Sequence, residues 1–237
     1  MRIRLCVLGL LFFTTAAEAQ FANAACAREE IVVIGAEAEE ADACDAVEGV
    51  FSYLAAAGIR PPARLVIRFQ PNVMLTLEAG GSSPSTLLAV SGYYDARRNE
   101  VRITSLESPW TAHRRPWGLP WDRRLGFSIL RHEIAHAVIY YALGETSGRL
   151  PRAWHEALAY AVQIELMEPD LRAEVLARYP AKEAFGSMLH INDFVYGVDP
   201  DAFAISAYKT YVREGRQSFI NRALGFQYEM IDLRDLP

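Results

Sequence analysis

The most regular pattern in this sequence is a helical repeat that begins at Asp122 and ends at Gly144. Apolar side chains recur there at intervals of three to five residues, at Leu125, Ile129, Ile134, Val138 and Ala142. Glycine commonly ends a helix. The pattern therefore predicts one long helix over this segment.

Helical patterns continue towards the end of the chain. Pro151 begins a second helix, expected over residues 152–167 and ending before Pro169. The segment 145–150 predicts a turn that folds this helix back against the first. Further helices are expected over residues 171–178, 184–189, 203–214 and 217–224.

The first half of the chain indicates strands instead. Residues 31–34 and 65–69 are short apolar runs, separated by an alanine-rich helix over 37–57 and by a Gly-Ile-Arg-Pro-Pro breaker. Residues 87–94 and 100–104 predict a hairpin, whereas 73–77 either continue the second strand or form a short helical turn. Strands followed by helices predict an α+β fold, with a small strand, helix and hairpin sheet layer before a helical half.

The first predicted helix contains the sequence His132-Glu133-Ile134-Ala135-His136. Residues four apart on a helix lie on the same face, so both imidazoles can bind one Zn²⁺ ion. Glu133 follows His132 directly and can take a proton from a water molecule on that ion. A catalytic zinc site needs a third protein ligand and an open fourth position. The alternative is a half-buried histidine pair with an exposed glutamate.

The candidate for the third ligand is Glu156, near the start of the second helix. If that helix folds back, the carboxylate projects towards the histidines and completes a His₂Glu set. Glu165 lies further along the helix and Glu168 adjoins Pro169, so both are weaker candidates.

This pattern resembles the gluzincin metallopeptidases, whose His-Glu-x-x-His sequence is followed about twenty residues later by a glutamate on a second helix. Nineteen residues separate His136 from Glu156, which is similar to the thermolysin-type arrangement. The stretch Pro-x-x-Trp-x-Glu-x-Leu-Ala around Glu156 resembles one found in many bacterial members. It departs from that stretch in two ways, because Ala157 replaces a glycine and Trp154 lies one place nearer the glutamate. The resemblance covers residues 125–163 well and the first hundred residues loosely.

The resemblance implies a zincin-like fold and a zinc-dependent peptidase, with His132, His136 and Glu156 as metal ligands and Glu133 as general base. The family commonly uses a tyrosine or histidine to stabilise the oxyanion. His190, Tyr208 and Tyr211 are the candidates, and packing is the alternative role of each. Tyr93 and Tyr94 lie on a hairpin similar to the family's edge strand, along which a substrate backbone could pair. His113 and His155 are expected at the surface or behind the ligands.

Two other functions stay open. The chain is short for a gluzincin, which allows a non-catalytic domain of the same fold that binds metal or a partner. A metal-free, disulfide-stapled interaction domain is the third alternative. Its support is the aromatic segment 108–124, which has three tryptophans and is either an ordered loop or the rim of a substrate site. No pattern indicates which peptide or protein would be the substrate, or the oligomeric state.

The N-terminus predicts export. Arg2 and Arg4 precede an apolar run, and Ala17-Glu18-Ala19 is a typical cleavage signal, so residues 1–19 are expected to be a signal peptide and 20–237 a single domain. The mature protein would then be periplasmic or secreted. Cleavage removes Cys6 and leaves Cys26 and Cys44, which we expect to form a disulfide in an oxidising compartment, two free thiols being the alternative.

Composition excludes several classes of protein. About half of the 237 residues are hydrophobic and 22% are charged, which excludes a disordered chain. The net charge of −5 argues against nucleic-acid binding. No internal apolar run approaches the length of a membrane span, about 18 residues. The expected partner is a peptide or protein substrate.

Overall fold

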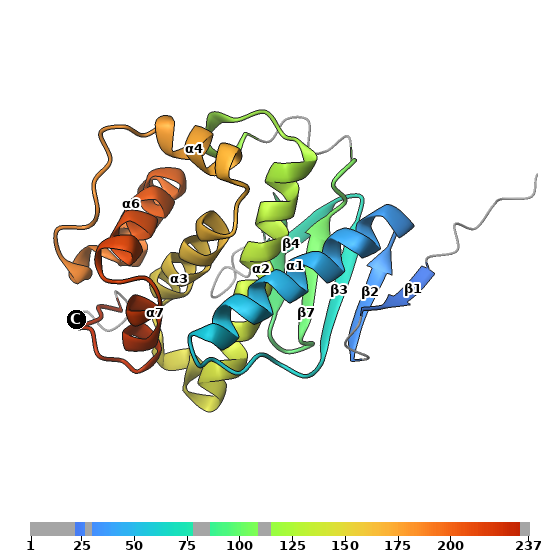
Figure 1. Cartoon of the computed structure of the whole chain (residues 1–237), viewed down its shortest axis with the longest axis horizontal. Coiled ribbons are helices and arrows are strands. Elements are labelled where there is room, and N and C mark those ends of the chain that lie inside the picture. Colours follow the sequence, from blue (N-terminus) through green and yellow to red (C-terminus); the bar gives the residue numbers. More distant parts are fainter. Residues whose placement is uncertain (1–21, 27–29, 78–85, 109–114, 233–237) are drawn as a thin grey trace, which may run out of the picture.

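The first half of the chain forms a five-stranded sheet with the strand order β1-β2-β3-β7-β6 (Figure 1). The computed structural model describes residues 22–26, 30–77, 86–108 and 115–232. The strands are β1 (Ala22–Ala25), β2 (Ile31–Gly35), β3 (Leu65–Gln70), β6 (Gly92–Asp95) and β7 (Glu100–Thr104). β2, β3 and β7 are parallel, and the two outer strands run antiparallel to their neighbours. Val33, Ile67 and Val101 pair across the parallel strands and are fully buried.

Helix α1 (Glu37–Ala56) connects β2 to β3 and lies across one face of the sheet (Figure 1). Alternate residues of β2 and β3 are buried, as expected for strands that present one face to a helix. Cys26 and Cys44 form a disulfide that joins the segment after β1 to α1, which confirms the predicted pairing. The predicted signal peptide lies outside the described residues.

The expectations for residues 73–77 and for the hairpin need correction. Residues 73–77 neither continue the preceding strand nor form a helical turn. They form β4 (Val73–Leu77), which pairs with β5 (Thr86–Val90) in a separate two-stranded sheet. The predicted strand 87–94 is divided by a bend at Ser91, so that only β6 pairs with β7. The bend lets one apolar run serve two sheets.

The second half is helical, and this order of strands before helices confirms the α+β class. Its helices are α2 (Arg123–Leu143), α3 (Arg152–Glu165), α4 (Pro169–Ala177), α5 (Asp193–Val198), α6 (Pro200–Arg213) and α7 (Gln217–Leu224). The prediction of a helix over 184–189 is wrong, because that region holds only a short 3₁₀ turn, η4 (Met188–His190). α5 was not expected, and its start is capped by the Asn192 side chain, which accepts from Val195 N.

Aromatic packing holds the helical half together. Trp154 on α3 is fully buried and stacks against Phe219 on α7 and against Tyr228. In Figure 1, α2 stands between the sheet and the helices α3, α4, α6 and α7, and it contacts α1, α3 and β6. None of the helices in the described part of the chain has the length and apolar character needed to cross a membrane.

Candidate metal centre

Helix α2 presents its two histidines and Glu133 to the interior. Its start is fixed by Asp122, whose side chain accepts from Leu125 N at 2.8 Å, and its end by Gly144 with a φ of 53°. His132, Glu133 and His136 are all at least nine-tenths buried. Polar side chains this deeply buried in the middle of a helix need partners.

Helix α3 supplies the third member of the group. The 3₁₀ turn η3 (Gly144–Arg149) reverses the chain, so α3 packs back along α2 as expected. Ala135 on α2 and Ala157 and Ala161 on α3 are fully buried, and such small side chains permit a close approach of two helices. This packing brings Glu156 opposite the histidines.

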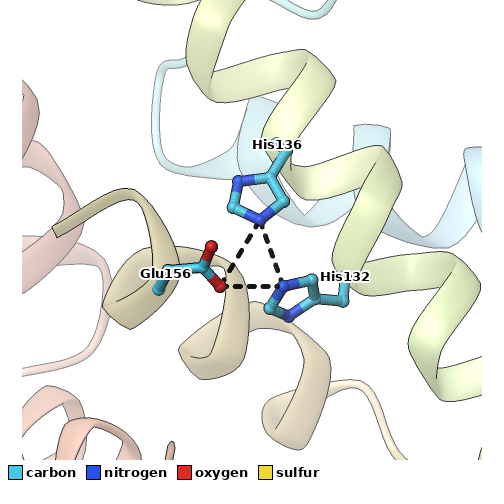
Figure 2. A group of neighbouring side chains, drawn as sticks. All are labelled: His132, His136 and Glu156. Carbon is cyan, nitrogen blue, oxygen red and sulfur yellow. Dashed lines mark hydrogen bonds and ion pairs between the residues drawn. The ribbon is translucent and has the colours of Figure 1, made fainter. Parts of the chain in front are cut away.

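The three predicted ligands converge (Figure 2). His132 Nε2 and His136 Nε2 lie 3.1 Å apart. Glu156 Oε2 lies 3.5 Å from the first nitrogen and 3.8 Å from the second. Ligand atoms that share one tetrahedral zinc ion at about 2 Å are about 3.3 Å from one another. The spacing of this group therefore fits a metal ion bound by two imidazoles and one carboxylate.

Electrostatics in the metal-free group favour charge on one histidine and on the glutamate. Burial disfavours the charged form of His132 and of Glu156, but the interactions of each with oppositely charged side chains together have the larger effect on its pKa. Glu156 and Glu133 raise the pKa of His132, and the two histidines lower the pKa of Glu156 to about 2. Burial lowers the pKa of His136 to about 3, so this imidazole is neutral at physiological pH, as a metal ligand must be.

Glu133 occupies a different environment from Glu156. Burial raises its pKa to about 7, and the nearby Glu156 adds to the rise. His132 and a hydrogen bond from the backbone N–H of Tyr94 act in the opposite direction. A carboxyl group with a pKa near neutrality can both accept and release a proton under physiological conditions.

These residues line a cavity of about 650 Å³. One side is formed by Gly92, Tyr93 and Tyr94 on the edge strand β6, and the opposite side by α3. η3, α5 and the turn before α2 also contribute to the lining. Among the lining residues are Tyr140 on α2, Ser147 on η3, Arg152 and Tyr160 on α3, and Tyr196 on α5. Sequence reasoning missed Arg152, Tyr160 and Tyr196, because no motif marks residues that become neighbours only on folding.

The candidates for oxyanion stabilisation lie elsewhere. Tyr208 donates to Glu165 Oε2 at 3.0 Å, and Tyr211 hydrogen-bonds to Tyr53. His190 is exposed on η4, and none of these three side chains lines the described cavity. The positions of Tyr208 and Tyr211 follow from packing between α1, α3 and α6, which the sequence pattern does not reveal.

His155 and His113 were expected at the surface or behind the ligands, and the structure describes only His155. His155 is buried, lines the cavity and stacks on Tyr140 with ring centroids 4.5 Å apart. It therefore belongs to the cavity wall rather than to the surface. His113 lies outside the described residues.

Part of the aromatic segment 108–124 also reaches the cavity. Pro116 and Trp117, in the 3₁₀ turn η2 (Pro116–Gly118), line it, and Trp117 is buried. Trp121 packs away from it and donates to Leu106 O at 3.2 Å. Residues 109–114 lie outside the described residues.

Comparison with known proteins identifies the family but no activity. Searches of curated proteins and of solved structures returned no match. One family profile matches residues 31–225, which include the whole ligand group, Glu133 and the cavity. The chain therefore belongs to DUF6639, a family of unknown function.

Proposed function

We propose that this protein is an exported zinc-dependent peptidase of gluzincin type. The observation that carries the proposal is the convergence of His132, His136 and Glu156 beside a buried Glu133, in a cavity bounded by an edge strand. Two imidazoles and one carboxylate suit zinc, and three protein ligands leave one position open. The Cys26–Cys44 disulfide supports export to an oxidising compartment.

The metal, when bound by these three ligands, would act as a Lewis acid on a water molecule and on the substrate carbonyl. Glu133 would hold the proton in transit. In peptide hydrolysis the water oxygen bonds to the carbonyl carbon and the carbon–nitrogen bond breaks. A proton then passes from the water through Glu133 to the leaving nitrogen.

The edge strand β6 offers a place for the substrate backbone. β6 is the last strand of the sheet, so one of its edges has no strand partner among the described residues. An extended peptide can add to such an edge by main-chain hydrogen bonds. Because β6 contacts α2 and donates to Glu133, a peptide bound there would lie beside the general base.

Tyrosines in the cavity are suitable donors for a developing negative charge. Burial raises the pKa of Tyr160 and Tyr196, so both phenols stay protonated at physiological pH. Tyr94 already donates to Asn99 Oδ1 at 2.9 Å. Tyr160 and Tyr196 therefore replace the three candidates chosen from the sequence.

The first experiment measures the zinc content of the purified protein and of a Glu156→Ala variant, after loosely bound metal has been removed. We expect one equivalent in the unsubstituted protein and much less in the variant. Zinc in neither, with no uptake of added zinc, would overturn the metal site. Equal zinc in both would remove Glu156 from it.

The second experiment screens a peptide library for cleavage by the zinc-loaded protein. Glu133→Gln should abolish hydrolysis and keep the zinc. Glu174→Gln, an exposed glutamate on α4, is the matched control and should keep both. A protein that binds zinc but cleaves no peptide would favour the non-catalytic alternative.

A further inference from the structure

Arg152 is the one arginine or lysine among the described residues that line the cavity. It is the first residue of α3 and precedes Glu156 by one helical turn, so both side chains lie on the same face. The Glu156 side chain is 15% exposed, whereas that of Arg152 is 68% exposed. The positive charge therefore lies at the mouth of the cavity, next to the ligand group.

The contacts of Arg152 leave it able to bind a ligand. Its Nε atom lies 4.0 Å from Glu156 Oε1, which is longer than a hydrogen bond. The other oxygen of Glu156 faces the histidines. The guanidinium packs over the Tyr196 ring, with Cζ 5.1 Å from the centroid. Even with a hydrogen bond to the Tyr196 hydroxyl, most of the five donors of an arginine remain.

Another part of the cavity lining carries a carboxylate, that of Asp201. The ring centroids of Tyr160 and His132 are 4.5 Å apart. Trp117 packs edge-on against Tyr160, with ring centroids 6.5 Å apart. Asp201 Oδ2 accepts from Trp117 N at 2.8 Å. The cavity lining therefore holds one cationic side chain, Arg152, and an acidic side chain, Asp201, that is held by the backbone of Trp117.

We infer that Arg152 selects peptides that carry an aspartate or glutamate close to the cleaved bond, on the side nearest the start of α3. This inference rests on the proposed peptidase function and adds the substrate class to it. Guanidinium and carboxylate groups form paired, charge-assisted hydrogen bonds. Because Arg152 is largely exposed, we expect a preference of about twofold to fivefold rather than an absolute requirement.

The test uses the zinc-loaded, full-length Glu133→Gln variant, which should bind peptides without cleaving them. The probes are fluorescently labelled peptides with blocked termini, in pairs that differ by Glu or Gln at one position. Fluorescence anisotropy gives the Kd of each peptide. For one position we expect the Glu peptide to bind about twofold to fivefold more tightly, and the difference to shrink at high salt.

Further variants assign the preference to this side chain. Adding Arg152→Gln should abolish the difference between the paired peptides, and Arg152→Lys should retain part of it. The matched control is Arg149→Gln. Arg149 packs over Phe226 and does not line the described cavity, so its removal should leave the preference unchanged.

Three results would overturn the inference. The first is equal binding of both peptides of every pair, and the second is a preference that survives Arg152→Gln. The third is loss of zinc in Arg152→Gln with an equal decrease in affinity for both peptides, which would mean that Arg152 only supports Glu156. Failure of the unsubstituted protein to cleave any peptide, together with an Arg152-dependent preference, would overturn the hydrolytic function alone.

Discussion

Gly92 on β6 lies so close to Glu133 on α2 that a Cβ atom at position 92 would be 3.0 Å from Glu133 Cγ. The same atom would lie 2.8 Å from Ile103 Cδ1 and 3.0 Å from the carbonyl oxygen of Arg102. Only a residue without a side chain fits this space. The edge strand and the proposed general base are thus in direct contact.

We expect Gly92→Ala to move β6 away from α2 and to disturb Glu133 without touching the ligands. Forcing a methyl group into packed surroundings costs about 1–3 kcal/mol. Peptidase activity should fall on the order of tenfold or more, while zinc stays at one equivalent. Urea unfolding and a kinetic assay measure both effects.

Gly186→Ala is the control for this substitution, because a Cβ atom there meets nothing within 4 Å. It should leave stability and activity unchanged. Full activity and stability in Gly92→Ala would contradict the close packing of Gly92 against Glu133.

Between pH 4.5 and 6.5, two opposed pKa shifts act on the stability of the metal-free protein. The pKa of Glu133 is raised from 4.5 to about 7, so between these values the folded chain holds an extra proton and its contribution to stability falls as pH rises. The pKa of His136 is lowered from 6.5 to about 3, so between these values the unfolded chain holds the extra proton and the contribution rises with pH. The two contributions cancel between pH 4.5 and 6.5.

Glu133→Gln removes the contribution to stability that falls as pH rises. Relative to the unsubstituted protein, the free energy of unfolding of the metal-free variant should therefore increase with pH across that window, by on the order of 1 kcal/mol for each pH unit. His136→Gln should give a difference of the opposite sign. Urea titrations of chelator-treated protein at several pH values measure these slopes, and parallel curves for all three proteins would contradict the prediction.

Zinc should stabilise the folded protein through the three ligands. A free zinc concentration a hundredfold above Kd should add about 2.7 kcal/mol to the free energy of unfolding, because the ion binds the folded state preferentially. A chelator should remove that increment. Thermal unfolding with and without zinc measures it, and Glu156→Ala should show little response. An equal increase in Tm for both proteins would place the zinc elsewhere.

Loss of the disulfide should destabilise the protein without changing the cavity. Cys26 and Cys44 are 18 residues apart, and closing a loop of this size is worth about 3 kcal/mol in the chain-entropy description. The double variant Cys26→Ser, Cys44→Ser should lose about that much in urea unfolding and keep its zinc. A reducing agent should have a similar effect on the unsubstituted protein and none on the variant.

The sequence predicted the parts of the site that depend on local geometry. His132 and His136 share a face because of helical spacing alone. Glu156 reaches them because the chain reverses direction between two consecutive helices. The long helices were predicted because their apolar repeats extend over several turns. In each case the determining interactions lie close together along the chain.

What the sequence did not predict depends on contacts between distant segments. The pairing of β4 with β5 requires a register that no short pattern specifies. The six-residue helix α5 has no buried residues, and it is too short for an apolar pattern to repeat over several turns. Arg152 and Tyr196 meet because Asp193 on α5 accepts from Ala153 N at 2.8 Å, a contact that brings the start of α5 to the start of α3.

The helical hairpin of α2 and α3 also bears on the order in which the molecule is assembled. All three ligands lie on this hairpin, so little loop-closure entropy opposes their meeting. The surroundings of Glu133 require β6, which must first join a sheet built from distant strands. On the proposed function, a refolding chain would thus gain affinity for zinc before it gains a correctly placed base, and the capture of metal would precede the onset of catalysis.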